Sequence, residues 1–265
     1  MEQFDWFRPE DLPFLFKALS QSKSPTVLVG GQSLTFWVDY YQIDIPDTES
    51  PYLTQDADIF GTALDAIIVC KALGGHLEIP DASDSTANTA LITFNTSDGR
   101  SLLIDFMGRL IGLNEKEIIS TSIKLTDEEF GEINVLNPKL VLCSRLANLK
   151  ALPSKRDGNG VAQARVAIDV CKQYFIEESL ALDEDKQEDY LMNSARWLAK
   201  LAQSAKALYV FKNWGIDVLT AAPIELIKHT KFHSLDWPKQ VEWVTEKRKP
   251  NKPLSKKTYA KPRTK

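Results

Sequence analysis

Two aspartates separated by one residue stand in a short apolar segment, "DADIF", at positions 56–60. If this segment is a strand, Asp56 and Asp58 point to the same side of the sheet, because side chains alternate with a period of two. Carboxylates so close together repel each other unless a cation lies between them, and a hard divalent ion such as Mg²⁺ or Mn²⁺ suits such a pair. The spacing therefore predicts a metal site.

A third acid, Asp105, interrupts the apolar run "SLLIDFM". A carboxylate in such a run is costly to bury unless something pairs with it. If this strand neighbours the strand with Asp56 and Asp58, three carboxylates converge. They would hold the metal together, and one of them would take the proton from an attacking hydroxyl.

Two glycines follow another apolar run, in "TVLVGGQSL". Where a strand opens into a helix, backbone N–H groups lack partners and the helix dipole favours anions, so Gly30 and Gly31 would let a phosphate approach. Ser33 adds a hydroxyl in the first turn. Acids that hold a cation, facing a turn that holds an anion, are what metal-assisted nucleotidyl transfer requires.

Each signal also has a plain structural interpretation. Asp56 and Asp58 alone would be an acidic surface turn, and a Gly-Gly turn needs no function. A second pair of this kind, Asp183 and Asp185, is expected at a solvated helix start. The ordered set of Gly-Gly, Asp-x-Asp and a strand Asp is more specific than any one of its parts.

The elements that must position these residues form two parts. Residues 1–136 alternate strand and helix patterns. The expected elements are a helix over 9–22, a strand before Gly30, a helix with Leu34, Trp37, Val38 and Tyr41 on one face, a strand at 57–60, a glycine-closed helix after it, and strands at 76–79, 89–95 and 101–107. A hairpin turn is expected at Asp98-Gly99. Residues 137–246 have helical periodicity. The fold class is α/β (α+β), a mixed sheet flanked by helices and followed by a helical bundle domain.

"VGGQSL", "TQDADIFG" and "LLIDF" together resemble the signature of the DNA polymerase beta-like nucleotidyltransferase superfamily, over residues 26 to 106. The surrounding residues are similar to the abortive-infection toxin-like (AbiEii-like) group. The resemblance implies that Gly30, Gly31 and Ser33 contact a nucleoside triphosphate. It also implies that Asp56 and Asp58 hold Mg²⁺ and that Asp105 completes the metal site and acts as base.

In toxin-like relatives, a basic residue on a helix after the catalytic half and a later aspartate help to hold the nucleotide. The resemblance places Arg145 and Asp169 in these roles, with Lys150 as a rival to Arg145. Alanine at position 57 is smaller than the branched residue usual in the family. The segment between Gly31 and Asp56 is longer than in compact members.

Composition narrows the class of protein further. Among 265 residues, 43% are hydrophobic and 26% charged, as in a folded globular chain. No run approaches the roughly 18 apolar residues of a membrane span, and the acidic start is unlike a secretory signal. We therefore expect a cytoplasmic protein.

The widely spaced Cys70, Cys143 and Cys171 are expected to be buried thiols. His229 and His233 are expected on a helix surface without a metal.

The net charge of −4 hides an asymmetry. Nine of the 32 basic residues and none of the 36 acidic ones fall in residues 247–265, so the preceding part of the chain carries a net charge of −13. This tail is expected to be a mobile basic arm, either holding RNA through phosphate contacts or only keeping the protein soluble.

The function expected from these signals is Mg²⁺-dependent transfer of a nucleoside monophosphate from a nucleoside triphosphate to an acceptor hydroxyl. RNA, in particular a tRNA end, is the first choice of acceptor, followed by a protein hydroxyl or a small molecule such as an antibiotic. A cognate antitoxin protein is a possible partner. The alternative is a nucleotide- or partner-binding module without turnover.

Overall fold

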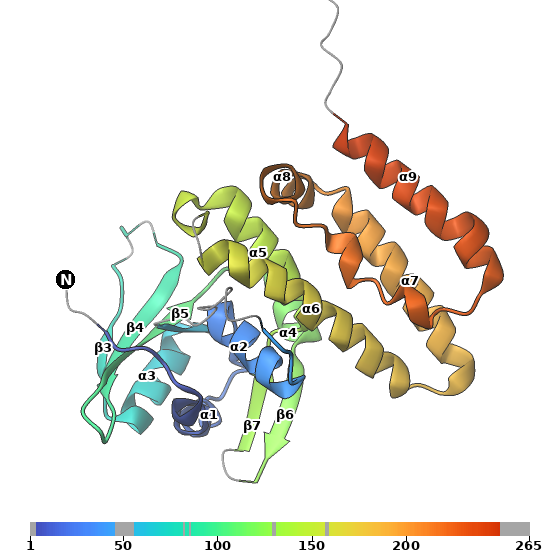
Figure 1. Ribbon diagram of the computed structural model, residues 1–265. Helices are drawn as coiled ribbons and strands as arrows, with labels where there is room; N and C mark the ends of the chain where they lie inside the picture. Colours follow the sequence, from blue (N-terminus) through green and yellow to red (C-terminus); the bar gives the residue numbers. More distant parts are fainter. Residues whose placement is uncertain are drawn as a thin grey trace, which may run out of the picture.

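The computed structural model contains one mixed sheet of seven strands in the order β3-β4-β5-β2-β1-β7-β6 (Figure 1). Pairing is parallel between β2 and β5 and between β1 and β7, and antiparallel elsewhere. The strands span β1 Val27–Leu28, β2 Asp56–Phe60, β3 His76–Glu78, β4 Asn88–Asn95, β5 Ser101–Met107, β6 Ile123–Asp127 and β7 Gly131–Val135. The structure describes residues 4–45, 56–81, 83–84, 86–128, 131–156 and 159–249.

The central strands separate a buried face from a polar one. Along β5, Leu102, Ile104 and Phe106 are fully buried, whereas the intervening residues, including Asp105, are partly exposed. Because side chains alternate along a strand, the apolar residues face the core and Asp105 points to the opposite face. The expected hairpin between β4 and β5 is confirmed, with Gly99 at a φ of +86° in its turn.

Four helices accompany the sheet: α1 Leu12–Leu19, α2 Gly30–Tyr40, α3 Ala63–Leu73 and α4 Glu115–Thr121. Helix α3 begins at a capping box in which Thr62 and Asp65 bond each other's backbone N–H, and it ends at Gly74, which adopts the left-handed conformation. Leu34, Trp37 and Val38 form the buried face of α2, as the sequence predicts.

The C-terminal half is helical and covers α2 (Figure 1). Its helices are α5 Pro138–Ala151, α6 Asn159–Leu180, α7 Glu184–Ala202, α8 Ala205–Trp214 and α9 Trp237–Arg248. The Trp37 indole N–H of α2 donates to the carbonyl of Leu136, just before α5, over 2.8 Å. The predicted fold class, a mixed sheet flanked by helices and followed by a helical bundle, is confirmed.

Several features differ from the sequence expectations. Helix α4 and strands β6 and β7 are not among the elements predicted from the sequence. Helix α9 continues to Arg248, so the first residues of the expected basic arm are helical. Arg248 pairs with Asp217 and lies over the Phe211 ring at 3.7 Å. The expected loop at 42–51 lies largely outside the described residues, as does the rest of the arm.

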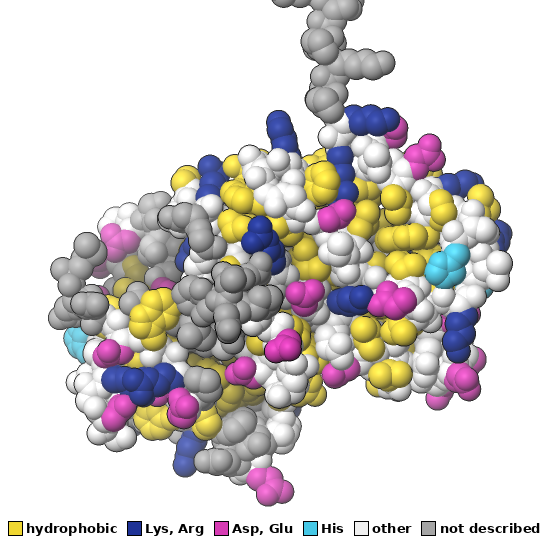
Figure 2. Space-filling view, in the orientation of Figure 1, with side chains coloured by type: hydrophobic (Ala, Val, Ile, Leu, Met, Phe, Trp, Pro, Cys, Tyr) yellow, Lys and Arg dark blue, Asp and Glu magenta, His cyan; other side chains and the backbone are white. Residues whose placement is uncertain are grey.

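The surface in Figure 2 mixes basic and acidic side chains, and hydrophobic side chains gather over the C-terminal helices. Trp243 of α9, 55% exposed, is among the large hydrophobic residues exposed to solvent. Within the described parts of the chain, no helix has both the length and the apolar character needed to cross a membrane.

Candidate active site

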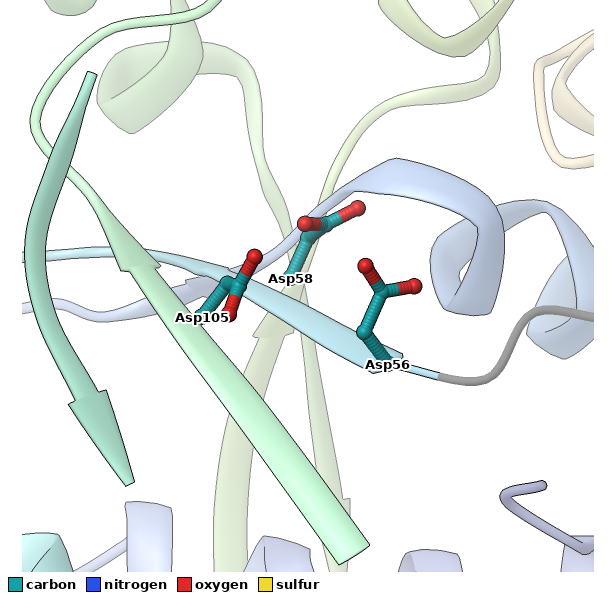
Figure 3. Close-up of side chains that lie close together, drawn as sticks. All are labelled: Asp56, Asp58 and Asp105. Atoms are coloured by element: carbon teal, nitrogen blue, oxygen red, sulfur yellow. The ribbon is translucent and has the colours of Figure 1, made fainter. Parts of the chain in front are cut away.

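The parallel pairing of β2 with β5 brings the three predicted acids together. Asp58 and Asp105 are direct partners in the register, and Asp56 pairs with Leu103 on the same two strands. Since Asp56 and Asp58 are two residues apart, all three side chains rise from one face of the sheet (Figure 3). One carboxylate oxygen from each lies within 4.8 Å of the others. We call Asp56, Asp58 and Asp105 the acid trio.

The first two residues of α2, which we call the glycine step Gly30–Gly31, lie directly beside the acid trio. The backbone N–H of Val29 donates to the carbonyl of Asp58 over 2.9 Å, which joins the end of β1 to β2. Gly30 has a φ of +65°, and a Cβ built there would lie 1.7 Å from Asp58 Oδ2. Only glycine fits this position, because a side chain would occupy the space of the carboxylate.

Burial and mutual repulsion both perturb the acid trio. Burial raises the pKa of Asp58 to about 7, and the charge of Asp56 adds to this rise, while Arg145 and Lys155 oppose it. Burial and then Asp56 likewise raise the pKa of Asp105 to about 6, against a hydrogen bond from Asn88. In the protein alone, the ionised trio is therefore held at an electrostatic cost.

A divalent cation fits this arrangement. Asp105 Oδ1 is buried, and no described residue donates a hydrogen bond to it. An acceptor left without a partner is unfavourable in the protein alone, and a metal ligated there would satisfy it. Carboxylate oxygens are the ligands that Mg²⁺ and Mn²⁺ prefer. Among the described residues, the acid trio is the one group of three or more acids, histidines or cysteines positioned to hold a metal.

The acid trio and the glycine step open into a cleft of about 780 Å³, which we call the central cleft. Strands β2 and β5 contribute the acids, and the start of α2 contributes the glycines. The side formed by the C-terminal half is polar, and we call it the helical wall. It consists of Ser144, Arg145 and Asn148 of α5 and Asn159, Gly160 and Gln163 of α6.

Arg145 is the buried cation of the helical wall. Its exposed fraction is 7%, and its Nη1 donates to Gln163 Oε1 over 2.9 Å. Its Nε is buried without a hydrogen-bond partner among the described residues. Burial lowers the pKa of the guanidinium, whereas the charges of Asp58 and Asp56 act to raise it. Arg145 thus faces the acid trio across the cleft and offers an unused donor.

The other predicted nucleotide-binding residues lie elsewhere. Ser33 is fully buried, and its hydroxyl donates to the carbonyl of Gly30 over 2.9 Å, so it fixes the first turn of α2 and does not line the central cleft. Asp169 is exposed on α6, outside the lining residues. Lys150 is exposed and also outside the lining, whereas its rival Arg145 lines the cleft.

Sequence analysis missed several residues of the cleft. Lys155 stands in the 3-10 turn Pro153–Lys155, lines the cleft, and acts on the pKa of both Asp58 and Asp105. A Cβ on Gly160 would lie 1.9 Å from the carbonyl of Lys155, so this turn packs tightly on the start of α6. The sequence feature that indicates this close packing is Gly160, because a glycine has no side chain to keep the turn away from the helix. Gln163 gave no such signal, because polar residues on helices are usually solvated.

The remaining candidate groups are structural. Cys70, Cys143 and Cys171 are free and buried, as the sequence predicts. His229 and His233 are exposed, as predicted, but only His233 lies on a helix, because His229 belongs to the irregular segment before it. The His233 ring contacts the carbonyl of Ile227 at 2.6 Å. Asp183 directly precedes α7 at an exposed position, and its carboxylate accepts from Lys186 Nζ over 2.6 Å, which confirms the predicted solvated helix start.

Comparison with known proteins gives little likeness. No protein-family model matches the chain, and no curated protein matches it. A crystal structure of JHP933 from Helicobacter pylori superposes with a TM-score of 0.39 and 13% identity, covering 89% of this chain and 94% of that one. An H. pylori structure described as a "putative nucleotidyltransferase" has a TM-score of 0.34 and 14% identity, covering 91% and 97%. Likeness at this level does not identify a function, so we infer the function from the geometry of the site.

Proposed function

We propose that this protein is a metal-dependent nucleotidyltransferase, which moves a nucleoside monophosphate from a nucleoside triphosphate to an acceptor hydroxyl. The observation that carries the proposal is the convergence of the acid trio with the glycine step in one cleft. Cation-holding and anion-holding groups in contact suit a polyphosphate substrate, whose charge must be neutralised from several sides.

The proposed reaction assigns each part of the cleft a task. A new bond forms between the acceptor oxygen and the α-phosphorus, the bond from that phosphorus to the bridging oxygen breaks, and pyrophosphate leaves. Asp56 and Asp58, completed by Asp105, would hold the metal. A divalent cation bound there neutralises phosphate charge and lowers the pKa of the acceptor hydroxyl.

The chain's own residues do the rest. The backbone N–H groups of the glycine step bind the phosphates, because the first turn of a helix leaves such groups without intrahelical partners. Arg145 and Lys155 balance the charge of the triphosphate from the opposite side. Asp105 accepts the acceptor's proton, as a carboxylate beside the reacting hydroxyl can do.

Incubation of the chain with each labelled nucleoside triphosphate, Mg²⁺ and total RNA tests the proposal. Transfer of label should be lost in Asp58→Asn and kept in Asp183→Asn, which removes an aspartate from the exposed Asp-x-Asp pair. Mg²⁺ should raise the Tm of the unmodified chain and of Asp183→Asn, but not of Asp56→Asn. Transfer that survives in Asp58→Asn would refute the assignment.

The binding module without turnover gives a different result in the same experiments. Calorimetry would then show Mg²⁺-dependent nucleotide binding that depends on the acid trio, with no label on RNA, protein or small-molecule acceptors. Label transfer decides between the two, because both the enzyme and the binding module need the acid trio.

The finer assignments follow the resemblance in sequence. We infer a toxin-like (AbiEii-like) protein with a tRNA end as acceptor and a neutralising antitoxin protein as partner. Growth arrest on expression, lost in Asp58→Asn, tests the toxin assignment. Removal of residues 250–265 tests the basic arm: RNA affinity should fall and become less dependent on salt, because fewer phosphate contacts form.

A further inference from the structure

Trp6 is a large aromatic residue that the core does not use. Its exposed fraction is 44%, whereas its neighbour Phe7 is 2% exposed and packs against Phe94. An indole exposed to this degree offers a flat apolar face to a ligand. Trp6 lines the central cleft together with the acid trio and the glycine step.

The backbone around Trp6 is held in place. The N–H of Asp5 donates to the carbonyl of Ser101 over 2.9 Å, and the Asp5 carboxylate accepts from the Ser101 N–H over 2.9 Å. Arg100 donates to the carbonyl of Trp6 over 3.3 Å and makes a two-bond pair with Asp11, at 2.8 and 2.6 Å. The indole is therefore presented on a fixed segment at the start of β5, which lowers the entropic cost of stacking a ligand on it.

The sheet order gives the central cleft two different sides. The glycine step follows β1, and α5 and α6 pack on α2, so the phosphate-binding groups and Arg145 lie on the β1 side of the acid trio. Trp6 is tied to β5, the strand that carries Asp105. The proposed proton acceptor therefore lies on the same side as Trp6, where an acceptor hydroxyl must arrive.

Arg109 and Ile111, which follow β5, also line the cleft and are exposed, Ile111 by 41%. An aromatic face combined with an exposed arginine is the chemistry of single-stranded nucleic-acid binding, in which bases stack on the ring and a cation holds the backbone. A small acceptor without a flat ring would leave Trp6 without a role.

We propose that Trp6 is the stacking platform for the terminal base of a single-stranded nucleic-acid acceptor, whose reacting hydroxyl is thereby directed to Asp105. This inference rests on the proposed function for the direction of the hydroxyl. Binding of the base to Trp6 is measurable without any transfer.

The test uses the full chain without nucleoside triphosphate and a fluorescently labelled single-stranded RNA of ten nucleotides. Stacking of one base contributes about 1–3 kcal/mol, so Trp6→Ala should weaken the Kd by roughly 5- to 150-fold. Trp6→Phe should lose less than about threefold, because it keeps an aromatic face. Trp243→Ala, which removes an exposed tryptophan from α9, should leave the Kd unchanged. The same RNA as a duplex should bind more weakly than the single strand.

A second measurement separates the acceptor from the incoming nucleotide. Calorimetric affinity for nucleoside triphosphate with Mg²⁺ should be the same in Trp6→Ala and in the unmodified chain. A loss confined to the triphosphate would overturn the proposal and assign Trp6 to the incoming base. Equal RNA binding by Trp6→Ala and the unmodified chain would also overturn it.

The two proposals fail in different ways. RNA binding that depends on Trp6, without label transfer to any acceptor, would refute the enzyme and keep the stacking platform. Label transfer to an acceptor without a base, unaffected by Trp6→Ala, would keep the enzyme and refute the platform. A single-stranded DNA of the same sequence shows whether the sugar contributes to recognition.

Discussion

Gly30 lies so close to Asp58 that any side chain there must displace the carboxylate. We expect Gly30→Ala to lower the free energy of unfolding through two effects: the left-handed conformation of an L-residue costs about 1–2 kcal/mol, and forced overpacking about 1–3 kcal/mol more. Urea unfolding measures the sum. The variant should also lose its stabilisation by Mg²⁺, because Asp58 has moved.

Gly74 provides a matched control for this change. It has the same φ of +65°, but a Cβ there would meet nothing within 4 Å. Gly74→Ala should therefore show the conformational cost alone. Equal losses in the two variants would show that the contact between Gly30 and Asp58 is unimportant.

Asp58 should make the stability of the metal-free protein depend on pH. Its pKa is about 7 in the folded chain, above the roughly 3.9 of an unfolded aspartate, so the folded state binds a proton first as the pH falls. The free energy of unfolding should rise by about 1.4 kcal/mol from pH 8 to pH 6 through Asp58 alone. Asp105 adds a smaller rise near pH 6.

Urea unfolding in the presence of a chelator checks this dependence. Asp58→Asn should remove most of the rise between pH 8 and pH 6, whereas Asp183→Asn should keep it. An unchanged slope in Asp58→Asn would mean that another group titrates in this range.

At the scale of elements, an ion pair between Arg100 and Asp11 helps to hold the segment of residues 4–11. The side chains of Arg100 and Asp11 are only 15% and 8% exposed. Arg100→Met should lower the urea midpoint of unfolding, because the carboxylate of Asp11 then loses its ionic partner. It should also speed hydrogen exchange in residues 4–11 and weaken RNA binding at Trp6.

Arg8→Met is the control for this prediction. Arg8 and Asp98 are 3.9 Å apart, and both side chains are more than half exposed, so solvent screens their interaction and it contributes little to stability. Hydrogen exchange in residues 4–11 should stay slow in this variant. Fast exchange in both variants would indicate that the arginine charges, and not the buried pair, hold the segment.

Local patterns predicted the elements that carry the site, but not how those elements pair. The two-residue spacing of Asp56 and Asp58 and the Asp98-Gly99 turn are short-range signals, and both were interpreted correctly. Parallel pairing of β2 with β5 depends on contacts between segments that are distant in the sequence. The sequence therefore predicts that Asp105 lies beside Asp56 and Asp58 only on the assumption that these two strands are neighbours. The helical wall was largely missed because its polar residues resemble a solvated face until α5 and α6 are placed beside α2.

For the whole molecule, the central cleft is shared by the sheet and the C-terminal helices. The division at residues 136 and 137 predicts two domains, yet Trp37 of α2 is 1% exposed and bonds the carbonyl of Leu136. Because α2 also packs against α5 and α6, we expect both parts to unfold together. Helical circular dichroism and tryptophan fluorescence should give the same urea midpoint.

Trp37→Phe tests whether this hydrogen bond couples the unfolding of the two parts, since the variant keeps an aromatic ring and removes the indole donor. It should lower the midpoint of both signals by the same amount, because the carbonyl of Leu136 loses a buried hydrogen bond, which costs about 1–3 kcal/mol. Two separate transitions in the unmodified chain would establish independently folding domains.

The parallel register of β2 and β5 limits how this chain can diverge. Inserting or deleting a single residue within either strand would turn its acids to the opposite face, whereas the connection from α2 to β2 can change in length at little free-energy cost. Distant descendants of such a chain should therefore keep these two short strands free of gaps while their intervening loops grow or shrink.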